Sequence, residues 1–174
     1  MIKREEKHSL QGQPLLQFNQ AVRSVFHQYT TFKGRARRSE FWWFVLFEFI
    51  VCFIASSLDA VIINFIYRKF GFLYKGSVGI LTLIIFLGLL LPGLAVLWRR
   101  LHDTGRSGWY YLMIFVPVIL STVLSFFSTV GSIFFGVLGL VCGVILLAFC
   151  CLDSQPGENK YGSSPKYIHS EIDS

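Results

Sequence analysis

Charged residues are scarce in this chain, and their scarcity excludes an ordinary soluble domain. Asp, Glu, Lys and Arg make up 15% of the 174 residues, whereas 53% are apolar and 17% are aromatic. In soluble globular domains about a quarter of the residues are charged. Because long stretches of this chain contain no charge at all, we interpret it as an integral membrane protein.

The sequence also lacks the patterns of the common catalytic and metal sites. It contains no nucleophile elbow, no zinc-protease helix signature and no P-loop. The four cysteines lie in apolar stretches without metal-ligand spacing, which favours packing residues over disulfides or metal ligands. A basic n-region followed at once by an apolar run is absent too, so no cleavable signal peptide is expected. We predict no catalytic residue, no metal and no cofactor.

Four apolar stretches are long enough to cross a bilayer. About 20 apolar residues are needed for a hydrocarbon core roughly 30 Å thick, and a helix satisfies its own backbone in lipid. We therefore predict an all-α membrane protein with four transmembrane helices, at about 41–67, 77–98, 109–128 and 131–152. The predicted divisions are a cytoplasmic lead at 1–33, a membrane domain at 34–153 and a cytoplasmic tail at 154–174.

Lysine and arginine are distributed unevenly around these spans, which predicts the orientation. Thirteen of the 16 fall in the lead before Phe41, the loop between the second and third spans, and the tail. Basic residues are retained on the cytoplasmic side, so we expect both termini in the cytoplasm. Topology and attraction to anionic lipid also account for the net charge of +6, and no nucleic-acid partner is expected.

An amphipathic helix is predicted ahead of the first span. Apolar residues recur at helical spacing from Leu15 to Phe32 and form one stripe. Such a helix lies either in the membrane interface or against the protein's own cytoplasmic end, and the sequence leaves both arrangements open. After it, Ser39 is expected to cap the first span, behind a basic collar of Lys33, Arg35, Arg37 and Arg38.

Two carboxylates fall inside the first predicted span. Glu48 and Asp59 are eleven residues apart, about three helical turns, and so point to nearly the same side. A carboxylate within a membrane is costly, which indicates either a structural hydrogen bond or coupling to a proton or ion. Glu48 lies deeper than Asp59, which we expect near the outer boundary.

Glycine and proline interrupt the other spans. Gly136, Gly139 and Gly143 share one face of the fourth predicted span, which permits close helix packing within the monomer or across a dimer. Pro92 and Gly93 loosen the second predicted span and are expected to kink it.

The stretch "VLWRRLHDTGRSGWYYLMIF", Val96 to Phe115, joins the second and third spans. If the second helix continues to about Thr104, Asp103 lies within reach of Arg99 or Arg100. Gly105 is then expected to stop that helix, and Ser107 to cap the next one. Adjacent helical residues point about 100° apart, which disfavours a catalytic pair of His102 and Asp103.

The tail begins with "CCLDSQPGENKYGSSPK", whose composition indicates an ordered turn followed by a loose end. It leaves the membrane on the same side as the basic collar and the middle loop. We therefore predict that these three polar clusters meet at the cytoplasmic face.

Three motifs, "GRARRSEFWWF", "RRLHDTGRSGWYYL" and "GENKYG", carry a resemblance to the domain-of-unknown-function 805 family of small bacterial inner-membrane proteins. The resemblance runs from about Phe32 to Pro165 and implies a bacterial inner-membrane location, with no established activity. The matching residues are Gly34, Arg35, Arg38, Phe41, Trp42, Arg99, Arg100, Leu101, His102, Asp103, Ser107, Gly108, Trp109, Asn159, Tyr161 and Gly162.

The expected function is a non-enzymatic membrane module whose cytoplasmic cluster binds an anionic lipid headgroup, a small anion or a partner protein. Two alternatives are a small transporter or channel subunit using Glu48, and a lipid-modifying enzyme using His102 and Asp103. Membrane lipids are the expected partners, and a homo-oligomer or a membrane protein partner is left open. The candidate ligand-binding residues are Arg35, Arg38, Arg100, His102, Asp103, Arg106 and Asn159.

Overall fold

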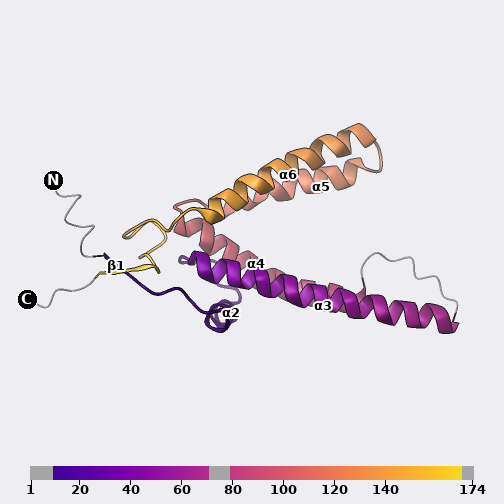
Figure 1. Ribbon diagram of the computed structural model, residues 1–174. Coiled ribbons are helices and arrows are strands. Elements are labelled where there is room, and N and C mark those ends of the chain that lie inside the picture. Colours follow the sequence, from indigo (N-terminus) through magenta and orange to yellow (C-terminus); the bar gives the residue numbers. More distant parts are fainter. Residues whose placement is uncertain (1–9, 71–78, 170–174) are drawn as a thin grey trace, which may run out of the picture. The chain divides into compact units, whose positions relative to one another are not determined.

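A computed structural model describes residues 10–70 and 79–169 (Figure 1). The elements in chain order are β1 (Leu10–Gly12), α2 (Phe18–His27), α3 (Arg38–Phe70), α4 (Ile80–Asp103), a 3-10 helix η1 (Gly108–Tyr111), α5 (Leu112–Leu124), α6 (Thr129–Cys151) and β2 (Tyr167–His169). The described residues form two compact units: one of residues 10–15, 31–38 and 96–169, the other of residues 16–30, 39–70 and 79–95.

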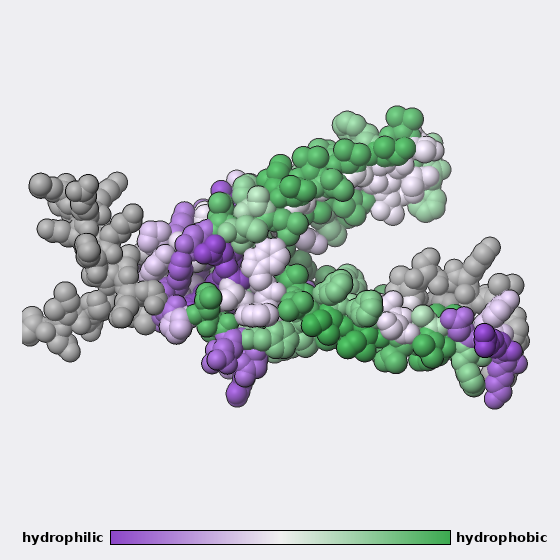
Figure 2. All heavy atoms as spheres, in the orientation of Figure 1, coloured by the Kyte–Doolittle hydropathy of each residue, from purple (hydrophilic) through white to green (hydrophobic). Residues whose placement is uncertain are grey.

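Within the described ranges, three helices are long and apolar enough to cross a membrane. They are α3 with 33 residues, α4 with 24 and α6 with 23. At most 22% of the most apolar window of any of them is buried inside the protein, so most of their apolar surface faces outward. Figure 2 shows this surface as hydrophobic residues along α3 and along α5 and α6. Apolar helices of sufficient length are therefore confirmed for the first, second and fourth predicted stretches.

The third predicted span, 109–128, is shorter than expected. Its first residues form η1, where the Ser107 hydroxyl accepts a hydrogen bond from the Trp109 amide, and α5 then covers only the 13 residues Leu112–Leu124. A turn follows, in which the Ser128 amide bonds to the Leu124 carbonyl at 2.7 Å. The apolar helix Gly108–Leu124 consequently falls below the length of the three candidate spans.

Helices α5 and α6 form a closely packed antiparallel hairpin (Figure 1). A methyl group on Gly139 would lie 3.3 Å from Val118 Cγ2, and one on Gly136 would lie 3.3 Å from Ser121 Oγ. The Ser121 hydroxyl also donates to the Ser132 carbonyl across the hairpin at 2.8 Å. Of the two uses left open for the glycine face, packing within the monomer is therefore the one observed.

The predicted amphipathic helix is α2, and it packs on the beginning of α3. The Phe26 ring meets the Phe44 ring edge-on at 5.8 Å. The Ser24 hydroxyl donates to Glu40 at 3.2 Å. Of the arrangements left open by the sequence, packing on the protein itself is thus present, and the buried residues of α2 are Ala21 and Val25.

The lead and the tail pair with each other through two short strands. Strand β1 runs antiparallel to β2, with Leu10 opposite His169 and Gly12 opposite Tyr167. Two three-residue strands at the ends of a helical chain were not predicted, because neither segment shows the alternation that marks a longer strand. The tail is therefore not a loose end as far as His169.

Candidate functional site

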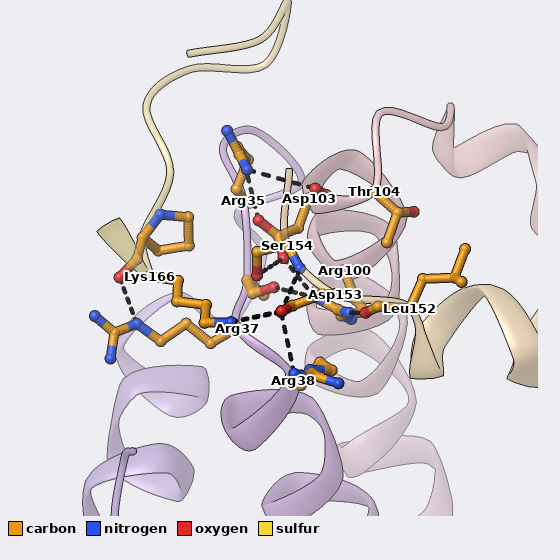
Figure 3. A network of polar contacts seen from close by, with 12 residues as sticks. Arg35, Arg37, Arg38, Arg100, Asp103, Thr104, Leu152, Asp153, Ser154 and Lys166 are labelled. Carbon is orange, nitrogen blue, oxygen red and sulfur yellow. Dashed lines mark hydrogen bonds and ion pairs between the residues drawn. The ribbon is translucent and has the colours of Figure 1, made fainter. Parts of the chain in front are cut away.

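The three predicted polar clusters meet in one unit, where they form a network of ion pairs and hydrogen bonds (Figure 3). We call this network the arginine junction. It consists of Arg35 and Arg38 from the basic collar, Arg100 and Asp103 from the end of α4, and Asp153, Ser154 and Lys166 from the tail.

An inner layer of the junction is centred on Asp103. The Arg35 Nε atom lies 2.9 Å from Asp103 Oδ1, and Arg100 Nη1 and the Ser154 hydroxyl both bond to Oδ2. The side chains of Arg35, Arg100 and Asp103 are at most 1% exposed. A buried carboxylate of this kind is stable only when cations and hydrogen-bond donors surround it, and all three donors here come from distant parts of the chain or the preceding helical turn.

Arg35 uses its whole guanidinium group to join the tail to Asp103. Beyond the bond to Asp103, Nη1 donates to the carbonyls of Gly157 at 2.8 Å and Gly162 at 3.2 Å. Nη2 donates to the carbonyls of Gln155 and Asp103. A guanidinium carries five N–H groups, and five acceptors are present. In this geometry Arg35 has no donor left for a ligand.

Arg100 closes the end of α6. Its Nε donates to the Cys150 carbonyl at 3.1 Å, Nη2 donates to the Leu152 carbonyl, and Nη1 also reaches the Ala36 carbonyl at 3.3 Å. The last carbonyls of a helix have no partner within the helix, and the helix dipole favours a cation there. Arg100 supplies both the donors and the charge.

An outer layer of the junction reaches solvent. Asp153 lies 3.0 Å from Arg38 Nη2 and 2.7 Å from Lys166 Nζ. The side chains of Arg38, Asp153 and Lys166 are 45%, 49% and 30% exposed. The hydrogen bond from Lys166 lowers the pKa of Asp153, and the same bond raises the pKa of Lys166.

His102 and Asn159 stand beside the junction and fix the tail turn. The His102 ring stacks on Tyr161 at 3.6 Å, with 4° between the planes, and Nδ1 lies 3.1 Å from the Gly34 carbonyl. Since a carbonyl only accepts, Nδ1 carries the proton. The Asn159 amide donates to the His102 carbonyl at 3.0 Å. Within the described residues no hydrogen bond joins His102 to Asp103, whose carboxylate is held by the inner layer.

Arg106 lies outside the junction. Its guanidinium carbon sits 4.0 Å from the centre of the Phe149 ring, and Nη1 donates to the Thr104 carbonyl at 3.3 Å. Stacking of this kind is a cation–π contact between the middle loop and α6. Of the seven residues predicted to bind a ligand, four belong to the junction, His102 and Asn159 lie beside it, and Arg106 contacts Phe149 and Thr104 instead.

Asp59 caps the beginning of α4. Its carboxylate accepts hydrogen bonds from the Leu81 amide at 3.2 Å and from both the amide and the hydroxyl of Thr82 at 2.7 Å. A methyl group on Gly79 would lie 2.0 Å from Asp59 Cγ, so this approach needs glycine. A carboxylate at a helix N-terminus satisfies free amides and complements the dipole. The role of Asp59 is therefore structural.

Glu48 lies against the middle of α4. A methyl group on Gly93 would come within 2.7 Å of Glu48 Oε1, so the carboxylate occupies the space that glycine leaves. The side chain is half-buried. No hydrogen bond or ion pair reaches it from the residues that the structure describes.

Sequence reasoning missed some contributors and placed one cap wrongly. Ser154 and Lys166 bond to the two carboxylates of the junction, and their only signal was their position just after the last span. Ser39 does not cap α3, because that helix already begins at Arg38, and the Ser39 hydroxyl is buried without a hydrogen-bond partner in the described part of the chain. By contrast, Gly105 has φ 76° and ends α4 as predicted.

Comparison with known proteins agrees with a membrane location. The chain is 36% identical over 142 residues to the inner membrane protein YhaH of Escherichia coli strain K12, covering 82% of this chain and 93% of the relative. It is also 36% identical over 144 residues to the inner membrane protein YhaI of the same strain, covering 83% and 93%. No solved structure matches. Residues 29–163 match the family described as protein of unknown function DUF805. This chain is thus an integral inner-membrane protein and belongs to the DUF805 family.

Proposed function

We propose that this protein is a non-enzymatic four-span module, with both termini in the cytoplasm, that binds anionic lipid headgroups through the outer layer of the arginine junction. The inner layer holds the cytoplasmic segments together and leaves the outer layer to meet the ligand. The ligand chemistry is a phosphate group, carried by a phospholipid.

The observation that supports this role is an excess of positive charge in both layers. Asp103 is shared by Arg35 and Arg100, and Asp153 is shared by Arg38 and Lys166. Each layer therefore holds two cations and one carboxylate. Main-chain carbonyls solvate the inner cations but bring no negative charge. An anion beside the exposed pair would balance the outer layer, and basic groups near a span attract anionic lipid by about 1 kcal/mol each.

The position of the outer layer fits a headgroup. Arg38 is the first residue of α3, and its Nη1 also reaches the carbonyl of Cys151, the last residue of α6. Both helices are candidate spans, so these ends belong at a membrane boundary. The uneven distribution of lysine and arginine supports the cytoplasmic assignment of that boundary.

Four spans remain the preferred topology although α5 is short. At 1.5 Å per residue α5 covers about 20 Å, and the four residues of η1 add about 8 Å. Together they approach the roughly 30 Å of a hydrocarbon core. Their close packing against α6, itself a candidate span, supports a hairpin that enters and leaves on one side.

A lipid-modifying reaction at His102 and Asp103 is less well supported. Acid or base work by this pair needs a hydrogen bond between an imidazole nitrogen and the carboxylate. His102 Nδ1 is directed to the Gly34 carbonyl instead, and Asp103 is committed to two arginines and a serine.

Native mass spectrometry of the full chain tests the proposal. The protein is released from nanodiscs containing equal amounts of phosphatidylglycerol and phosphatidylethanolamine, and the bound lipids are counted. We expect preferential phosphatidylglycerol binding, reduced roughly tenfold or more in Arg38→Gln/Lys166→Gln, because two attractions of about 1 kcal/mol are lost. Arg68→Gln is the matched control, since Arg68 is an exposed arginine at the opposite end of α3.

Asp153→Asn gives the sharper test. Removing the carboxylate that occupies Arg38 and Lys166 should increase phosphatidylglycerol binding, whereas a purely structural role predicts no increase. Equal loss in Arg68→Gln and in the double variant would contradict the proposal. Displacement of the lipid by millimolar inorganic phosphate would show that a free anion, rather than a headgroup, is the ligand.

A further inference from the structure

The α3–α4 hairpin contains a polar position that the lipid site does not use. Glu48 projects from α3 onto α4 where Gly93 lacks a side chain, and the residue before it, Pro92, is fully buried. Both residues lie inside α4, which is a candidate membrane span. A half-buried carboxylate therefore faces a proline–glycine step in the middle of a membrane helix.

At this step the hydrogen-bond ladder of α4 is interrupted. Pro92 has no N–H group, so the carbonyl four residues earlier, that of Gly88, loses its partner within the helix. The hydroxyl of Tyr29, which follows α2, donates to that carbonyl. The described part of the chain thus supplies an external donor to the released carbonyl but supplies none to the Glu48 carboxylate.

Among the residues that the structure describes, no counter-ion for the ionised form of Glu48 is packed against it. Between Ile80 and Trp98 α4 contains no ionisable side chain, and along α3 Asp59 is engaged with Thr82 and Glu40 with Ser24. After the end of α2, the Tyr29 hydroxyl is committed to the Gly88 carbonyl. The exposed Arg23 and His27 line a separate open hollow of about 330 Å³ together with Gln20, Ser24 and Gln28.

From these observations the geometry points to Glu48 as a proton-binding site within the membrane spans, with its carboxyl group neutral in the arrangement seen. A charged carboxylate removed from water without a cation is far costlier than a neutral carboxyl group, so uptake of a proton is the favourable outcome. Unlike the carboxylate, the neutral acid can also donate a hydrogen bond.

A proton fits this site better than a metal ion. Calcium takes six to eight oxygen ligands, and magnesium also needs near-complete octahedral coordination. Glu48 offers a single carboxylate, and the described residues contain no group of three or more acidic, histidine or cysteine side chains that could hold a metal. The inference is independent of lipid binding at the arginine junction.

Infrared spectroscopy of the full chain in nanodiscs tests the inference directly. We expect the carbonyl stretch of a protonated carboxylic acid at neutral pH, shifted in heavy water, and lost in Glu48→Gln. Asp59→Asn is the matched control on the same helix, and the band should persist there because Asp59 is hydrogen-bonded as a carboxylate.

Thermal unfolding provides a second readout, since glutamine is a neutral isostere of the protonated acid. Glu48→Gln should fold and unfold at a midpoint no lower than that of the parent protein at neutral pH. The inference is overturned if no protonated-carboxyl band exists at neutral pH, if the band survives in Glu48→Gln, or if that variant fails to fold.

Discussion

Asp103 and Glu48 both carry carboxyl groups that are withdrawn from water, but they differ in the hydrogen-bond donors and cations around them. Asp103 is fully buried and receives Arg35, Arg100 and Ser154. Glu48 is half-buried and receives no donor from the described residues. A buried carboxylate keeps its charge only where cations are brought to it, so the first is a fixed ionic centre and the second favours a proton. The arginine junction and the packed pair of α3 and α4 thus differ in whether cations are placed beside the buried carboxylate.

Asp103→Asn should destabilise the folded protein most. The substitution keeps the shape of the side chain but leaves Arg35 and Arg100 buried beside each other without the carboxylate. Breaking a buried pair by removing one partner costs about 3–5 kcal/mol. We expect a large loss of folded protein and a lower midpoint in thermal unfolding in detergent. Glu48→Gln is the matched carboxylate-to-amide control and should have little effect, so equal losses from both substitutions would contradict the distinction.

Asp59→Ala should have an intermediate effect. The change removes the acceptor of the Leu81 and Thr82 amides at the start of α4, and loss of a helix cap costs about 1–2 kcal/mol. Hydrogen exchange should accelerate at these two amides and remain unchanged at the end of α4. Asp59→Asn retains an acceptor oxygen and should restore much of the protection. Unchanged exchange in Asp59→Ala would show that the cap is not formed in the membrane.

The positions of most of the long helices follow from local sequence signals. The continuous apolar runs predict α3, α4 and α6, and the residues around Gly105 predict the end of α4, because these features depend on neighbours in the chain. The short length of α5 could not be predicted from the sequence, since "WYYLMIFVPVIL" is as apolar as a full span. Composition sets how much chain favours lipid, but the turn at Ser125–Ser128 sets where the helix ends.

The sequence predicts that the three segments of the arginine junction converge, but it does not predict which hydrogen bonds join them. The predicted four-span topology places the collar, the middle loop and the tail on one side, and helical spacing puts Asp103 within reach of Arg99 or Arg100. Arg35 donates hydrogen bonds to three carbonyls of the tail. These bonds depend on the path of residues 155–162, which no periodic pattern in the sequence encodes. The hydrogen bond from Tyr29 to the Gly88 carbonyl could not be predicted from the sequence either. Pro92 indicates only that this carbonyl lacks a partner within the helix.

The ion pair of Asp153 and Lys166 in the outer layer should contribute least to stability, and its contribution should depend on pH. Lys166 holds the pKa of Asp153 below its ordinary 3.8, so this carboxylate stabilises the fold above that value and the contribution disappears as the pH falls through the lowered pKa. Asp153 holds the pKa of Lys166 above its ordinary 10.5, so that contribution is complete below 10.5 and is lost as the pH rises through the raised pKa. Both groups are partly exposed, which limits the pair to below about 1 kcal/mol. Unfolding midpoints measured from pH 3 to 11 should therefore fall slightly at both ends of the range, and they should fall by less in Asp153→Asn. Raising the salt concentration should shrink the difference between the two proteins, because exposed charges are screened. If the difference persists in high salt, the pair behaves like the buried inner layer and the division of the junction into two layers fails.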